Sequence, residues 1–224
     1  MPIDYTKRPT GAGGGTPPPA GGPAPVSLSK VTLTKNAPTV SLAKHGGVGG
    51  RLEVALNWNA KAPSGLFKHA NPVDLDLACL YEFTDGSKGA VQALGNMLQA
   101  PANVPNPIVR LSGDDRSGGG GEQMFVDLDQ AASIRRIIVF AFIYEGAANW
   151  AEANGVVRLR PANAPEIEIT LDEPRNGART CAIALLTNTG GDIDVRREVR
   201  YIDGMQQALD KAYGWGMRWQ AARK

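Results

Sequence analysis

The stretch SIRRIIVFAFIYE, residues 133–145, decides the fold class of this 224-residue chain. Between Ile137 and Ile143 its apolar side chains fall on both sides of an extended backbone, because successive side chains of a strand point to opposite faces. A strand that is apolar on both faces is typical of the centre of a sheet. The stretch is too short for a transmembrane helix, which needs about 20 apolar residues. It therefore predicts a central, fully buried strand.

The segments on either side of this stretch carry the period-two pattern of further strands. Alternation of apolar and polar residues predicts half-buried strands at 51–59, 73–83 and 166–171. Residues 180–187 are again apolar on both faces, and residues 193–202 continue the series. Gly, Pro, Asn and Asp separate these segments. Many short strands with such turns predict an all-β sandwich of two sheets rather than alternating βαβ units.

One segment near the C-terminus has the signals of a helix. Asp203 is a suitable N-cap, Gln206 stands at the position that completes a capping-box-like pair, and Gly214 is a typical helix stop. The apolar residues Met205, Ala208, Leu209 and Ala212 share one face of the segment. The sequence thus predicts one short C-terminal helix, at about 204–213.

The beginning of the chain differs in composition from the rest. Residues 9–25 consist of Pro, Gly, Ala and Thr only, which bury little apolar surface, so residues 1–25 are predicted to be a disordered tail. Residues 26–35 then take up the period-two pattern with a change of phase, which predicts a bulge or two short strands. Residues 26–224 are therefore expected to form one domain.

Charge and cysteine content exclude several classes of protein. With 24 Lys and Arg against 22 Asp and Glu, the net charge of +2 argues against nucleic-acid binding, which depends on neutralising phosphates. The first ten residues lack the apolar core of a secretory signal, and two cysteines cannot form a disulfide framework. We expect a cytoplasmic protein without a transmembrane segment.

Asp74 and Asp76 are the first residues that could carry chemistry. They lie two apart in a predicted strand, so their side chains share a face at a spacing of about 6–7 Å. Ala78 and Leu80 follow on the same face, which predicts that it points into the core. Two carboxylates at the mouth of a buried face repel each other and lose hydration, and a bound cation would relieve both costs. The alternative is a frayed strand end with both carboxylates in water.

Residues 113–122, GDDRSGGGGE, form a second acidic motif. Calcium takes carboxylate and carbonyl oxygens from loops that can curl around the ion, and Asp114, Asp115 and Glu122 flank such a glycine-rich loop. A phosphate-binding loop is a poorer match, because the Gly-Lys-Ser/Thr ending and a following helix pattern are absent. A hairpin loop with incidental acidic residues is the remaining alternative.

Other reactive residue types show no pattern of a catalytic site. His45 and His69 are far apart in Gly- and Pro-rich surroundings, and Cys79 and Cys181 lie in apolar strands. No serine nucleophile motif and no acid/base pair is found, so the chain is not expected to be an enzyme.

The last residues mix aromatic and cationic side chains. Trp215 and Trp219 lie close to Arg218 and Arg223. This composition suits either binding to an anionic partner or docking of the helix and tail on the sandwich through their tryptophans, and docking is the favoured interpretation.

Taken in order, these motifs resemble the TerD-like domain family of bacterial tellurite-resistance and stress proteins. The resemblance covers about residues 26–224, and its closing run is more similar to the TerA branch of the family than to TerD itself. It rests on the ordered set of motifs and not on any single one. The segments that carry it are VSLSK at 26–30, Asn57-Trp58, Asp74-Leu75-Asp76, residues 113–118, Val126-Asp127-Leu128, Tyr144-Glu145-Gly146, Asn149-Trp150 and the run from Tyr201 to Lys224.

The resemblance implies a calcium-binding β-sandwich that acts without enzymatic activity, as a scaffold or interaction module in tellurite resistance and the stress response. The calcium ligands that it implies are Asp74, Asp76, Asp114, Asp115 and Glu122. Loops of the family hold several acids where this chain has Gly119 to Gly121, so both a weak calcium site and a metal-free module that has lost it stay open. The implied partners are other tellurite-resistance or stress proteins, in the cytoplasm or in a complex at the inner face of the membrane.

Overall fold

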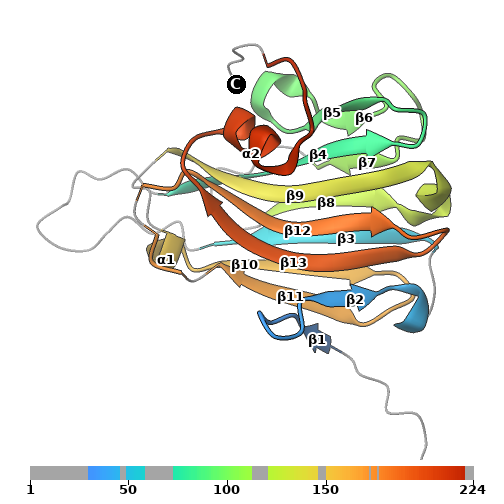
Figure 1. The fold of residues 1–224 in the computed structure, drawn as a ribbon, viewed down its shortest axis with the longest axis horizontal. Coiled ribbons are helices and arrows are strands. Elements are labelled where there is room, and N and C mark those ends of the chain that lie inside the picture. Colours follow the sequence, from blue (N-terminus) through green and yellow to red (C-terminus); the bar gives the residue numbers. More distant parts are fainter. Residues whose placement is uncertain are drawn as a thin grey trace, which may run out of the picture.

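Two β-sheets packed face to face form the body of the protein (Figure 1). The computed structural model describes residues 30–45, 49–58, 73–112, 121–145, 150–171, 173–175 and 177–219. The predicted disordered tail, residues 1–25, lies outside these segments. Within them the architecture is a β-sandwich with one short C-terminal helix, so the predicted all-β fold class is confirmed.

The first sheet contains seven strands. They are β1 (Lys30–Thr32), β3 (Arg51–Asn57), β6 (Gln99–Ala100), β7 (Val109–Leu111), β8 (Glu122–Asp127), β10 (Gly155–Pro161) and β11 (Glu166–Leu171). Their spatial order is β1-β11-β10-β3-β8-β7-β6, and every pair is antiparallel except β1 with β11. Alternating polar side chains form ion pairs between strands, such as Arg160 with Glu53 and Glu166, each at 2.8 Å.

The second sheet contains six strands, all paired antiparallel. They are β2 (Thr39–Ser41), β4 (Asp74–Phe83), β5 (Lys88–Val91), β9 (Ile134–Glu145), β12 (Thr180–Asn188) and β13 (Ile193–Ile202), in the spatial order β2-β13-β12-β9-β4-β5. Strand β9 is the stretch from which the fold was predicted. It lies inside the sheet between β12 and β4 and is buried from Ile137 to Ile143, which confirms the central strand.

Shorter helical elements connect the strands. They are η1 (Ala43–His45), η2 (Leu94–Asn96), η3 (Leu128–Ser133) and α1 (Trp150–Ala153), and the C-terminal helix is α2 (Gln206–Tyr213). None of the helices in the described segments combines the length and the apolar character needed to cross a membrane.

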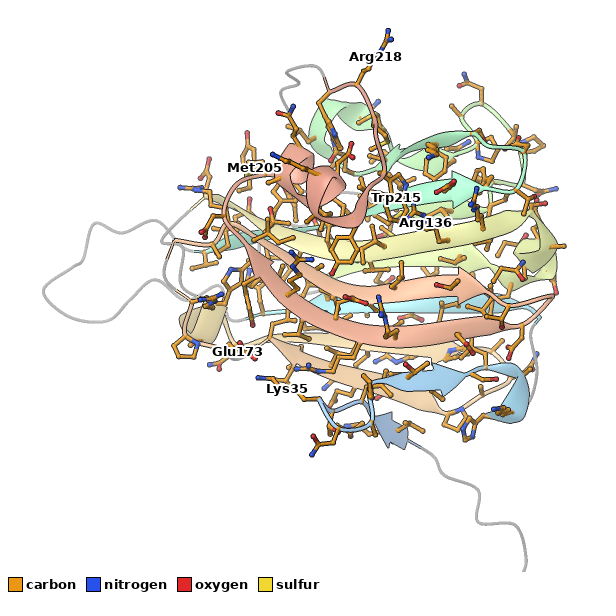
Figure 2. The ribbon with its side chains drawn as sticks, viewed as in Figure 1. Lys35, Arg136, Glu173, Met205, Trp215 and Arg218 are labelled. Carbon is orange, nitrogen blue, oxygen red and sulfur yellow. The ribbon has the colours of Figure 1, made fainter. Side chains whose placement is uncertain are left out.

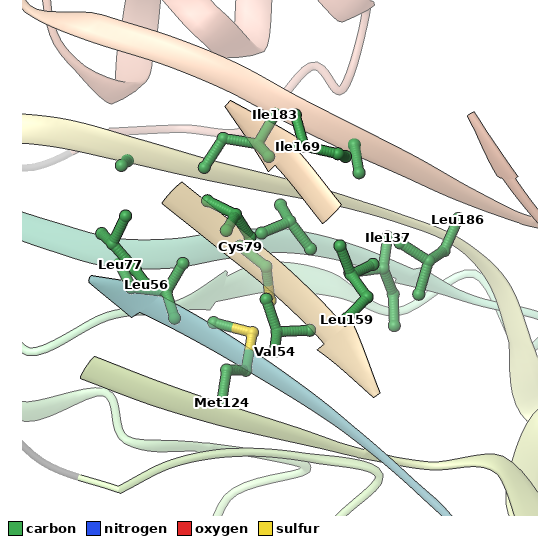
Figure 3. Close-up of a cluster of buried hydrophobic side chains, with 14 of the residues drawn as sticks. Val54, Leu56, Leu77, Cys79, Met124, Ile137, Leu159, Ile169, Ile183 and Leu186 are labelled. Atoms are coloured by element: carbon green, nitrogen blue, oxygen red, sulfur yellow. The ribbon is translucent and has the colours of Figure 1, made fainter. Parts of the chain in front are cut away.

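The main core fills the space between the two sheets (Figure 3). One face of β4 contributes Leu77 and Cys79, and β9 contributes Ile137 from the same sheet. The opposite sheet contributes Val54 and Leu159, and all five side chains are fully buried. Period-two alternation thus places every second residue of each strand in one continuous apolar layer, which stabilises the fold by about 1.5–3 kcal/mol for each large side chain buried.

A second apolar cluster lies on the other face of the six-stranded sheet, beneath α2. Here β9 contributes Ile138, Phe140 and Phe142, and the helix contributes Leu209. The strand is therefore buried on both faces for two different reasons: the second sheet covers one face, and α2 covers part of the other (Figure 1).

The predicted start of the helix is wrong by two residues. The N-cap is Met205, without any side-chain hydrogen bond, and Asp203 lies further upstream in a turn. That turn is held by Thr180 of β12, whose hydroxyl donates to the Gly204 carbonyl at 2.8 Å, so the backbone leaves the sheet before helical geometry can begin. The predicted stop is confirmed, because Gly214 has the left-handed conformation (φ 63°) of a helix C-terminus.

The C-terminal segment, residues 214–219, folds back on α2 and is held by Asp210. This carboxylate is buried and accepts from the backbone N–H groups of Gly216 (2.7 Å) and Met217 (2.9 Å) and from Nε1 of Trp219 (2.7 Å). The favoured interpretation of the C-terminal aromatic residues, docking on the sandwich, is therefore the one that the structure shows.

Trp215 anchors the C-terminal segment on the six-stranded sheet. Its side chain is buried, and Nε1 donates to the Tyr81 carbonyl of β4 at 3.0 Å. The guanidinium of Arg136 lies 3.8 Å from the ring centroid and donates to the carbonyls of Tyr213 (3.2 Å) and Gly214 (3.3 Å) at the end of α2. Figure 2 labels Trp215 and Arg136. Arg136 thus combines a cation–π contact with a favourable position at a helix C-terminus.

Glu82 completes this anchor from β4. Its carboxylate is buried and contacts Arg136 at 2.6 Å, Arg135 at 3.0 Å and Lys88 at 3.5 Å. Burial pushes the pKa of Glu82 upward, but the hydrogen bond from Arg136 and the charges of all three cations outweigh burial and hold the pKa below its ordinary value. Glu82 is therefore a buried carboxylate whose ionised form depends on its three cationic partners.

Candidate functional site

Asp74 and Asp76 lie at the beginning of β4, as the sequence predicted. Asp76 is fully buried, so the alternative of two carboxylates in open water is wrong for this residue. The face that it shares with Ala78 and Leu80 is the one that lies under α2, and not the face between the sheets. Asp74 is half-buried and pairs in register with Glu145 at the end of β9.

Glu122 reaches this end of the sandwich from the other sheet. Strand β5 pairs only with Cys79–Glu82 of β4, so Leu77 lies beyond the paired stretch. Its backbone N–H donates to the Glu122 carboxylate instead. Glu122 is only 1% exposed. A buried carboxylate thus joins the first residues of β4 and β8. The N–H group that it accepts from belongs to Leu77, the residue directly after Asp76.

Gly121 makes this position of Glu122 possible. Its φ of +72° is one that side chains rarely adopt, and a Cβ there would lie 2.4 Å from the Leu56 carbonyl oxygen and 2.7 Å from Oδ1 of Asn57. The chain can therefore enter β8 this close to β3 only with glycine at this position. Of the four glycines that precede Glu122 in the sequence, Gly121 is the one that lies in the described segments.

Replacing Gly121 with alanine should destabilise the protein by more than 2 kcal/mol, on the order of the largest backbone effects, because unfavourable φ and a collision with backbone atoms add. Gly177 provides a matched control, since its φ is +92° but a Cβ would meet nothing within 4 Å. Gly177→Ala should cost only the conformational part, about 1 kcal/mol. Urea unfolding of both variants measures the difference, and equal losses would contradict the close approach.

Three of the five predicted ligands are described by the structure, and the other two are not. Asp74, Asp76 and Glu122 lie at one end of the sandwich, whereas Asp114 and Asp115 fall outside the described segments. Among the side chains that the structure does describe, no three His, Cys, Asp or Glu residues form a group that could hold a metal ion. A calcium site here would therefore need oxygen ligands beyond these three carboxylates.

The remaining reactive residues have structural surroundings. Cys79 and Cys181 are both fully buried, and burial raises the pKa of Cys79 to about 12 and that of Cys181 as well. Neither thiol is a reactive thiolate at neutral pH. His45 is exposed in η1, and His69 lies outside the described segments.

Sequence reasoning missed two features of this half of the molecule. Glu145 was not considered as an acid of the site, because only the register of β9 against β4 places it opposite Asp74. A large groove beside α2 was also missed, since its walls come from distant parts of the chain. Neither feature leaves a signal in local spacing.

Comparison with known proteins gives one informative similarity. The chain is 42% identical over 207 residues to "Tellurium resistance protein TerA" from Alcaligenes sp., which covers 89% of this chain and 60% of that relative. The chain thus spans about three fifths of the relative's length. No family model matches the chain, and no solved structure matches it. The extent and level of this identity agree with the resemblance in the ordered motifs and support a TerA-like tellurium resistance family for this chain.

Proposed function

We propose that this protein is a non-enzymatic calcium-binding component of tellurium resistance, which acts as a scaffold or interaction module. The name of its relative supports the link to tellurium resistance. Its partners would be other resistance or stress proteins, in the cytoplasm or in a complex at the inner face of the membrane.

One observation supports calcium binding more than any other. Two carboxylates that are almost completely buried, Asp76 and Glu122, come from different sheets to the same end of the sandwich. Asp114 and Asp115 belong to the segment that joins β7 to β8 and precede Glu122 by eight and seven residues. Carboxylate oxygens are the ligands that calcium prefers, and when bound the ion would neutralise buried negative charge at this end.

Calcium should therefore stabilise the folded protein. With few acids in the loop we expect a Kd on the order of 10⁻⁵–10⁻³ M, and at a hundredfold excess over Kd a gain of about 2.7 kcal/mol. That gain should raise the melting temperature by about 5–10 °C, measured by calorimetry with and without calcium. Magnesium should give much less, because it retains its water shell and demands a tighter octahedron.

Two variants make this test specific. Asp76→Asn should abolish most of the calcium shift, whereas Asp203→Asn, which removes an exposed acid from the turn before α2, should leave it unchanged. If the wild-type protein shows no melting shift at about 10 mM calcium, well above the expected Kd, calcium binding is wrong.

A metal-free interaction module is the second candidate. It is favoured by the lack of a metal-holding group among the described side chains. In that case Asp76→Asn and wild type would behave alike in calcium, and the function would depend on the surface of the sandwich alone.

A further inference from the structure

A groove of about 1100 Å³ opens beside α2, at a distance along the chain from the acidic residues of the proposed calcium site. One wall consists of β5 and the turn through η2, and the other consists of the start of α2 and the C-terminal segment. Figure 2 shows Met205 at the beginning of α2 and Arg218 extending from the C-terminal segment. The volume lies slightly above the usual range of small-molecule sites, about 300–1,000 Å³.

The apolar lining of the groove is rich in methionine. Met97, Met205 and Met217 all line it, together with Trp219, and they are three of the five methionines of the chain. Met97 is 39% exposed, whereas the other large apolar side chains in the described segments are buried or half-buried. Methionine is flexible and polarisable and adapts to apolar ligands of different shape. The lining therefore suits ligands whose apolar part can vary in shape.

The charged groups of the groove are all cations. Lys88 and Arg218 line it, and none of the described lining residues is Asp or Glu. Two carboxylates lie near the lining without being part of it. Glu82 is shared between Lys88 at 3.5 Å and the closer Arg135 and Arg136, and Asp210 accepts three hydrogen bonds from the C-terminal segment, so Arg218 is the lining cation without a described carboxylate contact. Helix α2 begins in the same lining without a side-chain cap, which adds to the positive potential.

Buried amide side chains connect the two walls of the groove. Gln92 and Gln206 are 2% and 5% exposed, and Nε2 of Gln206 donates to Oε1 of Gln92 at 3.1 Å. Nε2 of Gln92 in turn donates to the Leu94 carbonyl at 3.1 Å. Because buried polar groups that are hydrogen-bonded hold their geometry, the groove is formed before any ligand arrives.

We propose that this groove binds a small amphiphilic organic anion, whose apolar body lies against the methionines and Trp219 while its anionic group faces Lys88 and Arg218. The adaptable lining accepts the body, and the charge of the lining selects the sign of the head group. This is a binding site separate from the carboxylates of β4 and β8, and it holds whether or not calcium is bound there.

Decanoate is the probe, titrated into the full-length protein by isothermal calorimetry in the presence of a calcium chelator. We expect one saturable site with a Kd below about 1 mM. Decyltrimethylammonium, which has the same chain and the opposite charge, should not bind, and acetate, which has the charge without the chain, should not bind either. Arg218→Glu reverses an exposed cation of the lining and should weaken decanoate binding at least tenfold. Met97→Glu, which places a carboxylate in the apolar lining, should do the same.

Arg110→Glu makes the same charge change at an exposed position of β7 and should leave the affinity unchanged. Three results would each overturn the proposal: no saturable binding of decanoate, equal binding of decyltrimethylammonium, or equal losses in Arg110→Glu and Arg218→Glu. Vesicles that contain anionic phospholipid provide the last arm. Binding to these vesicles without binding of free decanoate would also overturn the proposal, because the groove would then serve a membrane surface.

Discussion

Trp215→Ala is expected to lower the free energy of unfolding by about 3–5 kcal/mol, the cost of emptying a large buried aromatic site. The side chain is 1% exposed and belongs to the cluster that joins α2 to the six-stranded sheet. The substitution also removes its hydrogen bond to Tyr81 and its contact with Arg136. Urea unfolding followed by circular dichroism measures the loss without depending on tryptophan fluorescence.

Trp219→Ala is the control for this prediction. Trp219 belongs to the same segment and also donates a hydrogen bond, to Asp210, but it is only half-buried. Its loss should cost no more than half as much as that of Trp215, roughly in proportion to the apolar area buried. If the two variants lose equal stability, or Trp215→Ala loses less than about 1 kcal/mol, Trp215 is not the anchor of the C-terminal segment.

Arg136→Ala is expected to destabilise the protein by about 3–5 kcal/mol, because it removes the closest partner of a buried carboxylate. The side chain of Arg136 is 26% exposed and that of Glu82 is 4% exposed, so water replaces the lost contact poorly. The same change also removes the cation–π contact with Trp215 and two hydrogen bonds to the end of α2.

Arg135 offers a matched control on the same carboxylate. It contacts Glu82 at 3.0 Å, but its side chain is 67% exposed, so Arg135→Ala should cost only about 0–1 kcal/mol. A double-mutant cycle of Arg136→Ala with Glu82→Gln should show a coupling energy of more than 1 kcal/mol, since the two groups are in contact. Equal effects at positions 135 and 136 would refute the role of burial.

Acid unfolding should also depend on the ion pair between Glu82 and Arg136. The pKa of Glu82 is lowered in the folded protein, so its contribution to stability is present above its pKa in the unfolded chain and is lost as pH falls through the folded value. Arg136→Ala removes the hydrogen bond that contributes most to lowering the pKa of Glu82. Acid unfolding of this variant should therefore begin at a higher pH than that of the wild type.

The strands could be predicted from the sequence because their information is local. The apolar runs of β9 and β12 and the alternation of β3 fix which residues are buried, whichever strands become their neighbours. The helix stop at Gly214 was also predictable, since a left-handed residue at a helix end favours glycine.

The surroundings of the polar residues could not be predicted in the same way. Nothing in the helical pattern of α2 indicates that Asp210 is buried, because its three donors belong to a segment that folds back only in three dimensions. The face of Asp76 was assigned to the core correctly, but which of two cores it borders depends on where α2 docks. For the candidate site, the sequence indicated the residue types, whereas the approach of Glu122 to Leu77 depends on how the two sheets stack.

Strands β1 and β2 follow one another in the chain, yet they form the edges of different sheets. Their partners are β11 and β13, which come near the end of the chain (Figure 1). On the ribosome these first strands emerge long before the strands that complete them, so this edge of the sandwich can close only after almost the whole chain has been synthesised. Such contacts between residues far apart in the sequence slow folding, because the entropy of closing a long loop must be lost before the strands can pair. The order of synthesis thus makes the closing of this edge a late event in the formation of the domain.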